Sequence, residues 1–186
     1  MLRARGHDVI ATREPGGTPL GDALRAVFVT RGIAISAMAE AFVVNASRAQ
    51  HVQDVIEPAL RAGSVVLCDR FIDATFAYQG YGRGLDLAVL RALVAHATGG
   101  RMPDVTLLVD IDVASSHSRV AARARASGEA IDRLEREGPG FHDRVRAGYL
   151  ELARNDVRIA VLDGALPAEA LLARASEIVV AAIGRA

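Results

Sequence analysis

A chain of 186 residues is long enough for one ordinary globular domain, and 51% hydrophobic with 24% charged residues is a composition typical of folded proteins. The 22 acidic residues balance 22 basic ones, so net charge gives no general attraction to nucleic acid or to an anionic membrane. All basic residues apart from histidine are arginines, which excludes a lysine Schiff base, a lysine general base and a P-loop lysine from this sequence.

The single cysteine and the lack of long apolar runs bear on the cellular compartment. Cys68 has no second cysteine with which to form a disulfide or a cysteine-clustered zinc site, and one thiol in an apolar run suggests a reducing environment. No run approaches the roughly 18 apolar residues of a membrane span, and residues 1–7 lack the apolar stretch of a secretory signal. We therefore expect a cytoplasmic protein with neither nucleic acid nor membrane as partner.

Short apolar runs alternate with longer helical patterns, which predicts an α/β fold with a mainly parallel sheet. The runs expected to form strands are residues 8–12, 64–68, 105–111 and 158–162. Because none of them alternates strictly between polar and apolar residues, we expect helices on both faces of the sheet. Helical spacing of apolar residues covers positions 20–28, 37–62, 86–98, 141–152 and 167–183. No repeat or linker is visible, so we expect a single domain over residues 1–186.

Distinctive residues follow the ends of the predicted strands. The loop 13–18, "REPGGT", follows the first strand, "DRF" (residues 69–71) follows the second, and an arginine-rich segment covers residues 123–133. In open α/β sheets, ligands bind outside the carboxyl ends of the strands. We therefore expect these segments to converge on one substrate site.

Each of these segments has two interpretations from its residue types alone. Glu14 could accept a hydrogen bond from a sugar hydroxyl, or its loop could be an ordinary glycine and proline turn. Asp69 is placed to help hold magnesium and Arg70 to clamp a phosphate, or the two could form a surface ion pair or a helix cap. Arg48, on the long predicted helix, is spaced to face the same cleft, although a single helical arginine is more often exposed.

Two further segments carry polar groups suited to a nucleotide. Residues 77–84, "AYQGYGRG", offer aromatic faces and an amide that could pair with a base, and the glycine interruptions argue against plain core packing. The arginines around residues 119–136 could close over a transferring phosphoryl group as a lid, or could belong to a solvated helix face. The five histidines show no metal-ligand spacing, and no serine lies in a G-x-S-x-G nucleophile elbow.

The order of the motifs "TREPGGT", "SRAQHVQDVIEPAL", "DRFIDATFAYQGYGRGLD", "PDVTLLVDID" and "IDRLE…F…RVRAGYLELA" closely resembles the thymidylate kinase family over nearly the whole chain. That family transfers the γ-phosphate of ATP to dTMP with Mg²⁺ and yields dTDP for dTTP synthesis. The resemblance implies a P-loop-NTPase-like three-layer fold and a homodimer.

The resemblance also implies roles for the residues that would contact dTMP. Arg48 and Arg70 would hold the acceptor phosphate. Thr75 and Gln79 would meet the thymine edge. Tyr78 would lie against the sugar, where a 2′-hydroxyl would crowd it.

The remaining roles concern the deoxyribose, the metal and ATP. Glu14 and Pro15 would lie near the deoxyribose, with Glu135, and Asp69 would order the water shell of Mg²⁺. The catalytic set would combine Asp69 with four arginines of the lid segment 119–136. These are Arg119, Arg123, Arg125 and Arg133, and the first three would also bind ATP.

The sequence departs from the family pattern in two places. Val44 stands where the family typically has a phenylalanine that stacks on the thymine, a loss of about 1–3 kcal/mol by comparison with other stacking sites. Phe42 lies about 200° away around a helix and is a poor substitute. The sequence also begins after the expected first strand and G-x-x-x-x-G-K-[ST] loop, and residues 1–6 resemble the end of the helix that follows that loop. We expect a fold without its first, central strand, and an inactive 186-residue chain.

Four explanations of this departure are open at this point. The start codon could have been placed too far downstream in a normal kinase gene, or the chain could be a truncated, non-catalytic remnant that binds nucleotide or a partner subunit. The phosphate loop could come from another chain. A non-catalytic dimerising α/β domain would fit the apolar helices but would leave the motifs at the strand ends unexplained.

Overall fold

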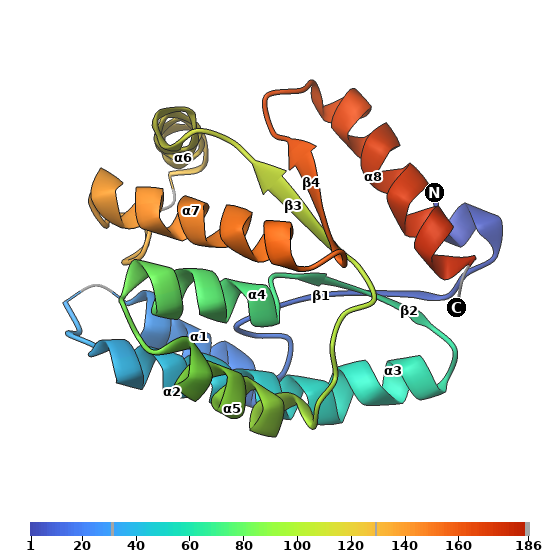
Figure 1. The fold of residues 1–186 in the computed structure, drawn as a ribbon, viewed down its shortest axis with the longest axis horizontal. Coiled ribbons are helices and arrows are strands. Elements are labelled where there is room, and N and C mark those ends of the chain that lie inside the picture. The colour runs from blue at the N-terminus through green and yellow to red at the C-terminus, as the bar shows by residue number, and fades with distance from the viewer. Residues whose placement is uncertain (31, 129, 185–186) are drawn as a thin grey trace. The chain divides into compact units, whose positions relative to one another are not determined.

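The computed structural model describes residues 1–30, 32–128 and 130–184. The chain divides into two compact units, Met1–Met102 and Pro103–Ala186. Each unit carries one pair of parallel strands (Figure 1). Each is described below by itself, and the expectation of a single domain stays a prediction.

The strands confirm the expected parallel α/β pattern. In the N-terminal unit β1 (Val9–Arg13) pairs with β2 (Val65–Asp69), and in the C-terminal unit β3 (Thr106–Asp110) pairs with β4 (Ile159–Asp163). Arg13 lies opposite Asp69 in the register of the first pair. The strand ends from which the first two motifs continue are therefore adjacent.

The first two helices begin at side-chain caps. The hydroxyl of Thr18 accepts from the Gly21 amide at the start of α1 (Pro19–Val29), and Ser36 caps α2 (Ala37–His51) in the same way. Phe28 of α1 is buried, whereas Leu20 and Val27 are exposed. The apolar face expected over residues 20–28 is therefore only partly buried within this structure.

The long helix expected over residues 37–62 is one helical rod with a widened turn. After α2 the hydrogen bonding changes to a π-helical segment, η2 (Val52–Ile56), and then returns to α3 (Glu57–Arg61). Pro58 is the second residue of α3, just beyond the widened turn. Proline has no amide hydrogen and its ring clashes with the preceding turn, which explains the widening of the helix there.

The segment 77–84 is helical as far as Gly82. It follows α4 (Ile72–Thr75) as a second π-helical segment, η3 (Phe76–Gly82), which packs against α5 (Leu87–Thr98). A Cβ on Gly80 would lie 2.6 Å from Cδ2 of Leu87, closer than any side chain tolerates. The interpretation of these glycines as a sign against core packing is wrong at this position, because Gly80 is what allows α5 to pack closely.

Helices cover the strand pair of each unit. Figure 1 shows α1, α2, α3 and α5 on the same side of β1 and β2. In the C-terminal unit α7 (Pro139–Asn155) and α8 (Ala168–Ile183) lie on opposite sides of the β3–β4 pair and both contact β4. The remaining helix, α6 (Val113–Ser127), packs against α7, and none of its residues is buried. No helix in the described part of the chain is long and apolar enough to cross a membrane.

Leu90 should anchor the helical layer of the N-terminal unit. Its side chain is 0% exposed between α2 and η3, whereas that of the adjacent Val89 is 45% exposed. We expect Leu90→Ala to lower the free energy of unfolding by about 3 kcal/mol, because it removes buried methyl groups and leaves a cavity. Val89→Ala, the matched control on the same helix, should cost less than about 1 kcal/mol. Urea denaturation measures both, and equal losses in the two variants would contradict this packing.

Candidate functional site

A buried ion pair joins the end of β1 to α2. The amide of Glu14 donates to the carbonyl of Asp69 at 2.9 Å, which keeps the chain paired one residue beyond β1. From there the Glu14 carboxylate accepts a hydrogen bond from Nε of Arg48 at 2.8 Å, and both side chains are only 3% exposed. Neither charge has enough contact with water to be solvated, so each depends on the other.

The Arg48 guanidinium also binds three other segments. Nη1 donates to Oδ1 of Asn45 at 3.0 Å and to Oγ1 of Thr75 at 2.8 Å, and Nη2 donates to the carbonyl of Phe71 at 3.1 Å. The guanidinium carbon lies 5.4 Å from the centre of the Phe71 ring. With the bond to Glu14, contacts among the described residues use four of its five N–H groups, which leaves one hydrogen on Nη2.

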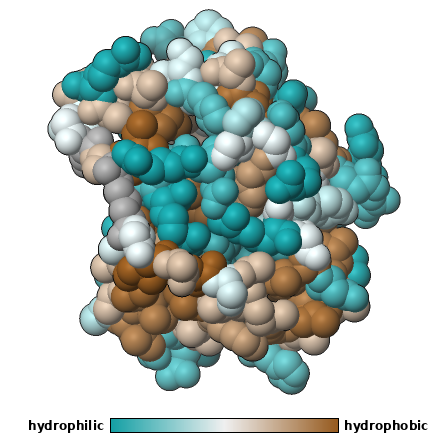
Figure 2. Space-filling view, turned by 90° about the vertical axis from the view of Figure 1, so that its left-hand side faces the viewer, coloured by the Kyte–Doolittle hydropathy of each residue, from teal (hydrophilic) through white to brown (hydrophobic). Residues whose placement is uncertain are grey.

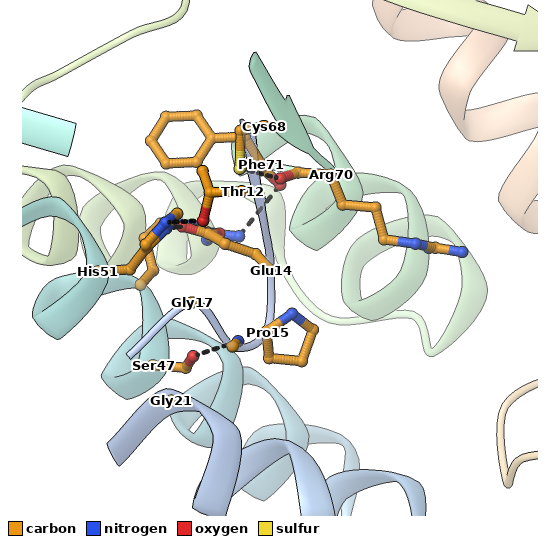
Figure 3. Close-up of polar contacts among 12 residues, drawn as sticks. Thr12, Glu14, Pro15, Gly17, Gly21, Ser47, His51, Cys68, Arg70 and Phe71 are labelled. Atoms are coloured by element: carbon orange, nitrogen blue, oxygen red, sulfur yellow. Dashed lines mark hydrogen bonds and ion pairs between the residues drawn. The ribbon is translucent and has the colours of Figure 1, made fainter. Parts of the chain in front are cut away.

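His51, one turn after Arg48, binds the other oxygen of the same carboxylate. Nδ1 lies 2.9 Å from Oε1 of Glu14, and Nε2 lies 2.7 Å from Oγ1 of Thr12, as Figure 3 shows. A Cβ on Gly17 would lie 2.9 Å from the ring of His51. The glycine-rich loop 13–18 therefore lies directly against this ion-pair cluster.

Glu14, His51 and Cys68 place potential metal ligands within 4.8 Å of one another. These donor atoms do not fit a cation well, because Arg48 and His51 use both oxygens of Glu14 and both His51 nitrogens have partners. Burial, and to a smaller extent the charge of Glu14, raises the pKa of the Cys68 thiol to about 12, so the sulfur stays neutral. The cluster is a hydrogen-bonded anchor rather than a metal centre.

Arg70 differs from Arg48 in both exposure and backbone. Its side chain is exposed, extends away from His51 in Figure 3, and places its guanidinium carbon 5.0 Å from the centre of the Tyr78 ring. Its φ of 65° makes it the non-glycine residue with a left-handed backbone among those described. Such a conformation costs about 1 kcal/mol or more and is concentrated at functional sites. Cys68 Sγ donates to the Arg70 carbonyl at 3.0 Å.

Gln79 lies in a second buried polar group. Its amide nitrogen donates to Oε2 of Glu40 at 3.3 Å, and Arg83 binds the same carboxylate through two nitrogens at 3.1 and 2.9 Å. Both Gln79 and Glu40 are buried. The amide predicted to meet a base is thus fixed by a carboxylate on α2 that we did not predict.

Sequence reasoning also missed Asn45 and His51, which complete the surroundings of Arg48 and Glu14. Both lie three residues from Arg48, so they share its face of α2. Polar residues at this spacing on a helix with apolar neighbours were a usable signal. Pro15, at the cis peptide bond after Glu14, accepts from Arg25 through its carbonyl at 3.2 Å.

The predicted lid arginines lie in the C-terminal unit. Arg119, Arg123 and Arg125 are exposed on α6, where Arg119 donates to the Gly164 carbonyl at 3.0 Å and Arg125 to that of Ala121 at 3.2 Å. Arg123 forms an ion pair with Glu135. Half-buried Arg133 follows in the loop, and residue 129 of the predicted lid lies outside the described residues. Glu135 therefore contacts one of the predicted lid arginines. In the N-terminal unit, Asp69 is the last residue of β2 and its side chain is exposed.

The raised pKa of Cys68 predicts slow alkylation of the folded chain. At pH 8.5 a thiol of pKa about 12 has a far smaller thiolate fraction than one at the ordinary 9.0, so iodoacetamide should react at least about 100-fold more slowly. The rate should rise with pH toward the raised pKa. The urea-unfolded chain is the control, since Cys68 is the only thiol. Similar rates for folded and unfolded chains would contradict burial of the sulfur.

Comparisons with known proteins agree on one family. The thymidylate kinase family model matches residues 1–175. The thymidylate kinase of Desulfovibrio desulfuricans is 51% identical over 172 residues, 90% of this chain and 79% of that protein. That of Deinococcus radiodurans is 47% identical over 171 residues, 91% of this chain and 81% of that protein.

A solved structure confirms the predicted fold class. The crystal structure of thymidylate kinase from Ehrlichia chaffeensis matches with a TM-score of 0.69 and 29% sequence identity, over 92% of this chain and 80% of that one. The α/β arrangement with parallel strands is therefore the P-loop NTPase fold. On the family match, the sequence identity and the shared fold, this chain belongs to the thymidylate kinase family of phosphotransferases.

Proposed function

We propose that the carboxyl ends of β1 and β2 hold dTMP as the acceptor of the γ-phosphate of ATP, which gives dTDP. One observation carries this proposal: the buried Arg48 guanidinium ties together Glu14, Thr75 and the Phe71 carbonyl. These groups come from the loop after β1, from α4 and from the residues after β2. Phosphoryl transfer depends chiefly on positioning and charge neutralisation: the hydrogen-bonded Arg48 network would supply a rigid base for the substrate, and the exposed Arg70 would supply the positive charge.

The two arginines would divide the work at the acceptor phosphate. Arg70 is exposed and offers its planar fork to a phosphate, with the strained backbone as support for a functional role. Arg48 would contribute the one Nη2 hydrogen that it has left and would hold Thr75 in place. Tyr78, against the Arg70 guanidinium, would lie beside the sugar.

The base and deoxyribose would meet the neighbouring residues. Thr75 and Gln79 would contact the thymine edge, with Gln79 held in one orientation by Glu40. Glu14 and Pro15 would lie near the deoxyribose, and Glu135 would serve there or through its ion pair with Arg123. In the absence of an aromatic residue at position 44, we propose weaker discrimination for thymine over other pyrimidines.

The donor side would depend on Asp69 and on the arginines of the C-terminal unit. An exposed carboxylate at a strand end fits Mg²⁺, which keeps several waters and binds through one or two carboxylates and substrate phosphates. Bound Mg²⁺ would neutralise charge on the transferring phosphoryl group. The arginines proposed to contact ATP and stabilise that charge are Arg119, Arg123, Arg125 and Arg133.

We also propose that the 186 residues taken alone bind dTMP without completing the transfer. The sequence contains no lysine and no G-x-x-x-x-G-K-[ST] motif, whose backbone amides, lysine and hydroxyl grip the donor phosphates and Mg²⁺. A non-catalytic protein that binds nucleotide or a partner subunit is the second candidate function. A single cysteine, with no second one in this sequence to form a disulfide, is compatible with a cytoplasmic setting, as is the ordinary composition of a folded protein.

Arg70 should be the most sensitive test of acceptor binding. We expect dTMP to bind the 186-residue chain saturably in calorimetry, and Arg70→Ala to raise its Kd by about 10- to 100-fold through loss of a charge-assisted contact. Arg91→Ala, at an exposed arginine of α5 in the same unit, is the matched control and should leave Kd unchanged. Equal Kd values for all three proteins would contradict the site.

The same preparation tests transfer. With ATP, Mg²⁺ and dTMP we expect no dTDP above background from the 186 residues. Turnover at about 1–100 s⁻¹, the ordinary range for kinases, would refute the proposed lack of transfer while supporting the substrate assignment. Phosphate transfer to dUMP in preference to dTMP by an active, longer form would support weakened thymine selection.

We propose further that the chain forms a homodimer through the helices of the N-terminal unit. Hydrophobic residues gather over this unit in Figure 2, and several large ones on or near α1, α2 and α5 are exposed. These are Leu20, Val27, Ile33, Phe42 and Val89. Phe42 is 56% exposed, which marks it as a candidate anchor for a second copy.

A charge at Phe42 should disrupt this dimer. We expect light scattering to give a dimer mass for the unmodified chain and a monomer mass for Phe42→Glu, because burying an unpaired carboxylate is costly. Leu172→Glu, at an exposed apolar position of α8, is the matched control and should leave the mass unchanged. A monomeric unmodified chain would contradict the proposal.

A further inference from the structure

Two histidines meet where α6 packs against α7. His117 of α6 and His142 of α7 have ring centroids 4.9 Å apart with their planes at 87°. The Nε2 atoms of both rings are buried and have no hydrogen-bond partner among the described residues. Phe141 covers the His142 ring from another side at 5.4 Å. Two buried nitrogens without partners are unusual, since buried polar side-chain atoms are normally satisfied.

The hydrogen bonding of His142 defines its neutral form. The Leu134 carbonyl accepts a hydrogen bond from this ring, and since Nε2 has no partner, Nδ1 is the donor. The neutral ring therefore carries its proton on Nδ1 and a lone pair on Nε2. A second proton would create a buried N–H with no acceptor, beside a second imidazole.

The groups around His142 shift its pKa in opposite directions. Burial is the largest effect and lowers the pKa of His142 from its ordinary 6.5, and the charge of His117 lowers it further. The acidic groups that face it, Glu137 of the preceding loop and Asp143 of α7, oppose this shift but are weaker than burial. The folded state thus favours the neutral ring at this contact.

α6 is anchored weakly within its unit. None of its residues is fully buried, and its contacts outside the helix include the Arg119 bond to Gly164 and the exposed Arg123 ion pair with Glu135. An exposed ion pair contributes only about 0–1 kcal/mol. A charged ring at the contact with α7 would therefore shift the equilibrium from docked toward released α6.

We propose that the His117–His142 contact is a proton-sensitive fastening that holds α6 against α7 near neutral pH and releases it on mild acidification. A ring whose pKa is lowered by docking stabilises the docked state above its ordinary pKa, and this stabilisation is lost as pH falls below that value. Acid would thereby release the helix that carries Arg119, Arg123 and Arg125. The effect on phosphate transfer rests on the proposed function of these arginines, whereas the fastening itself does not.

Hydrogen exchange along α6 tests the fastening without substrates. After correction for the intrinsic exchange rate, we expect protection of residues 113–127 to fall between pH 7.5 and 5.5, by no more than about tenfold at one unit below the ordinary pKa. In His142→Gln, which removes the ring whose pKa is lowered, this fall should be largely absent. The matched control, His96→Gln at an exposed position of α5, should keep the full change seen in the unmodified chain.

Two results would overturn the fastening. One is an equal acid-induced loss of protection in the unmodified chain and in His142→Gln. The other is an NMR titration in which His117 and His142 protonate without any shift of the α6 amides, a measurement that remains informative if the variant folds poorly. Because dTMP binding is measured separately with Arg70→Ala, failure of the acceptor site and failure of the fastening give different results.

Discussion

The N-terminal unit depends on one buried charge pair, Glu14 with Arg48. Removal of one partner from such a pair leaves an uncompensated buried charge, at a cost of about 3–5 kcal/mol. The pair is stabilised by further hydrogen bonds to both partners: His51 binds the second carboxylate oxygen, and Asn45 and Thr75 bind Nη1. The ends of the strands, α2 and α4 are therefore held in one arrangement, on which any ligand at those strand ends relies.

Strands with a short apolar run and helices with regularly spaced apolar residues were predictable from the sequence. All four strands begin and end within one residue of the expected positions, and β3 is one residue shorter at each end than the apolar run that predicted it. The segment around Gly80 was misjudged because glycine in a helix serves two opposite purposes, flexibility and close packing. Only the 2.6 Å approach to Leu87 decides between them.

The sequence indicated which residues belong to the candidate site, but not the contacts between them. Glu14, Arg48 and Thr75 were each expected near a nucleotide for separate reasons, yet the structure joins them directly to one another. Such contacts arise between positions 27 and 34 residues apart, which no local pattern encodes. In the C-terminal unit, both interpretations of the α6 arginines, a lid and a solvated helix face, predict the exposed side chains that the structure has, and the ion pair from Arg123 to Glu135 needed the fold of the intervening loop.

Close approach of backbone to the anchor also restricts how this chain can diverge. A Cβ on Gly17 would meet Thr12 Oγ1 at 2.7 Å, and one on Gly21 would meet the Gly16 carbonyl at 2.7 Å and Ser47 Oγ at 2.9 Å. The loop, the first turn of α1 and the polar face of α2 therefore form a single steric unit. A substitution in one of them is tolerated only with compensating changes in the others, so these three segments should vary together through evolution even though they lie in separate stretches of the chain.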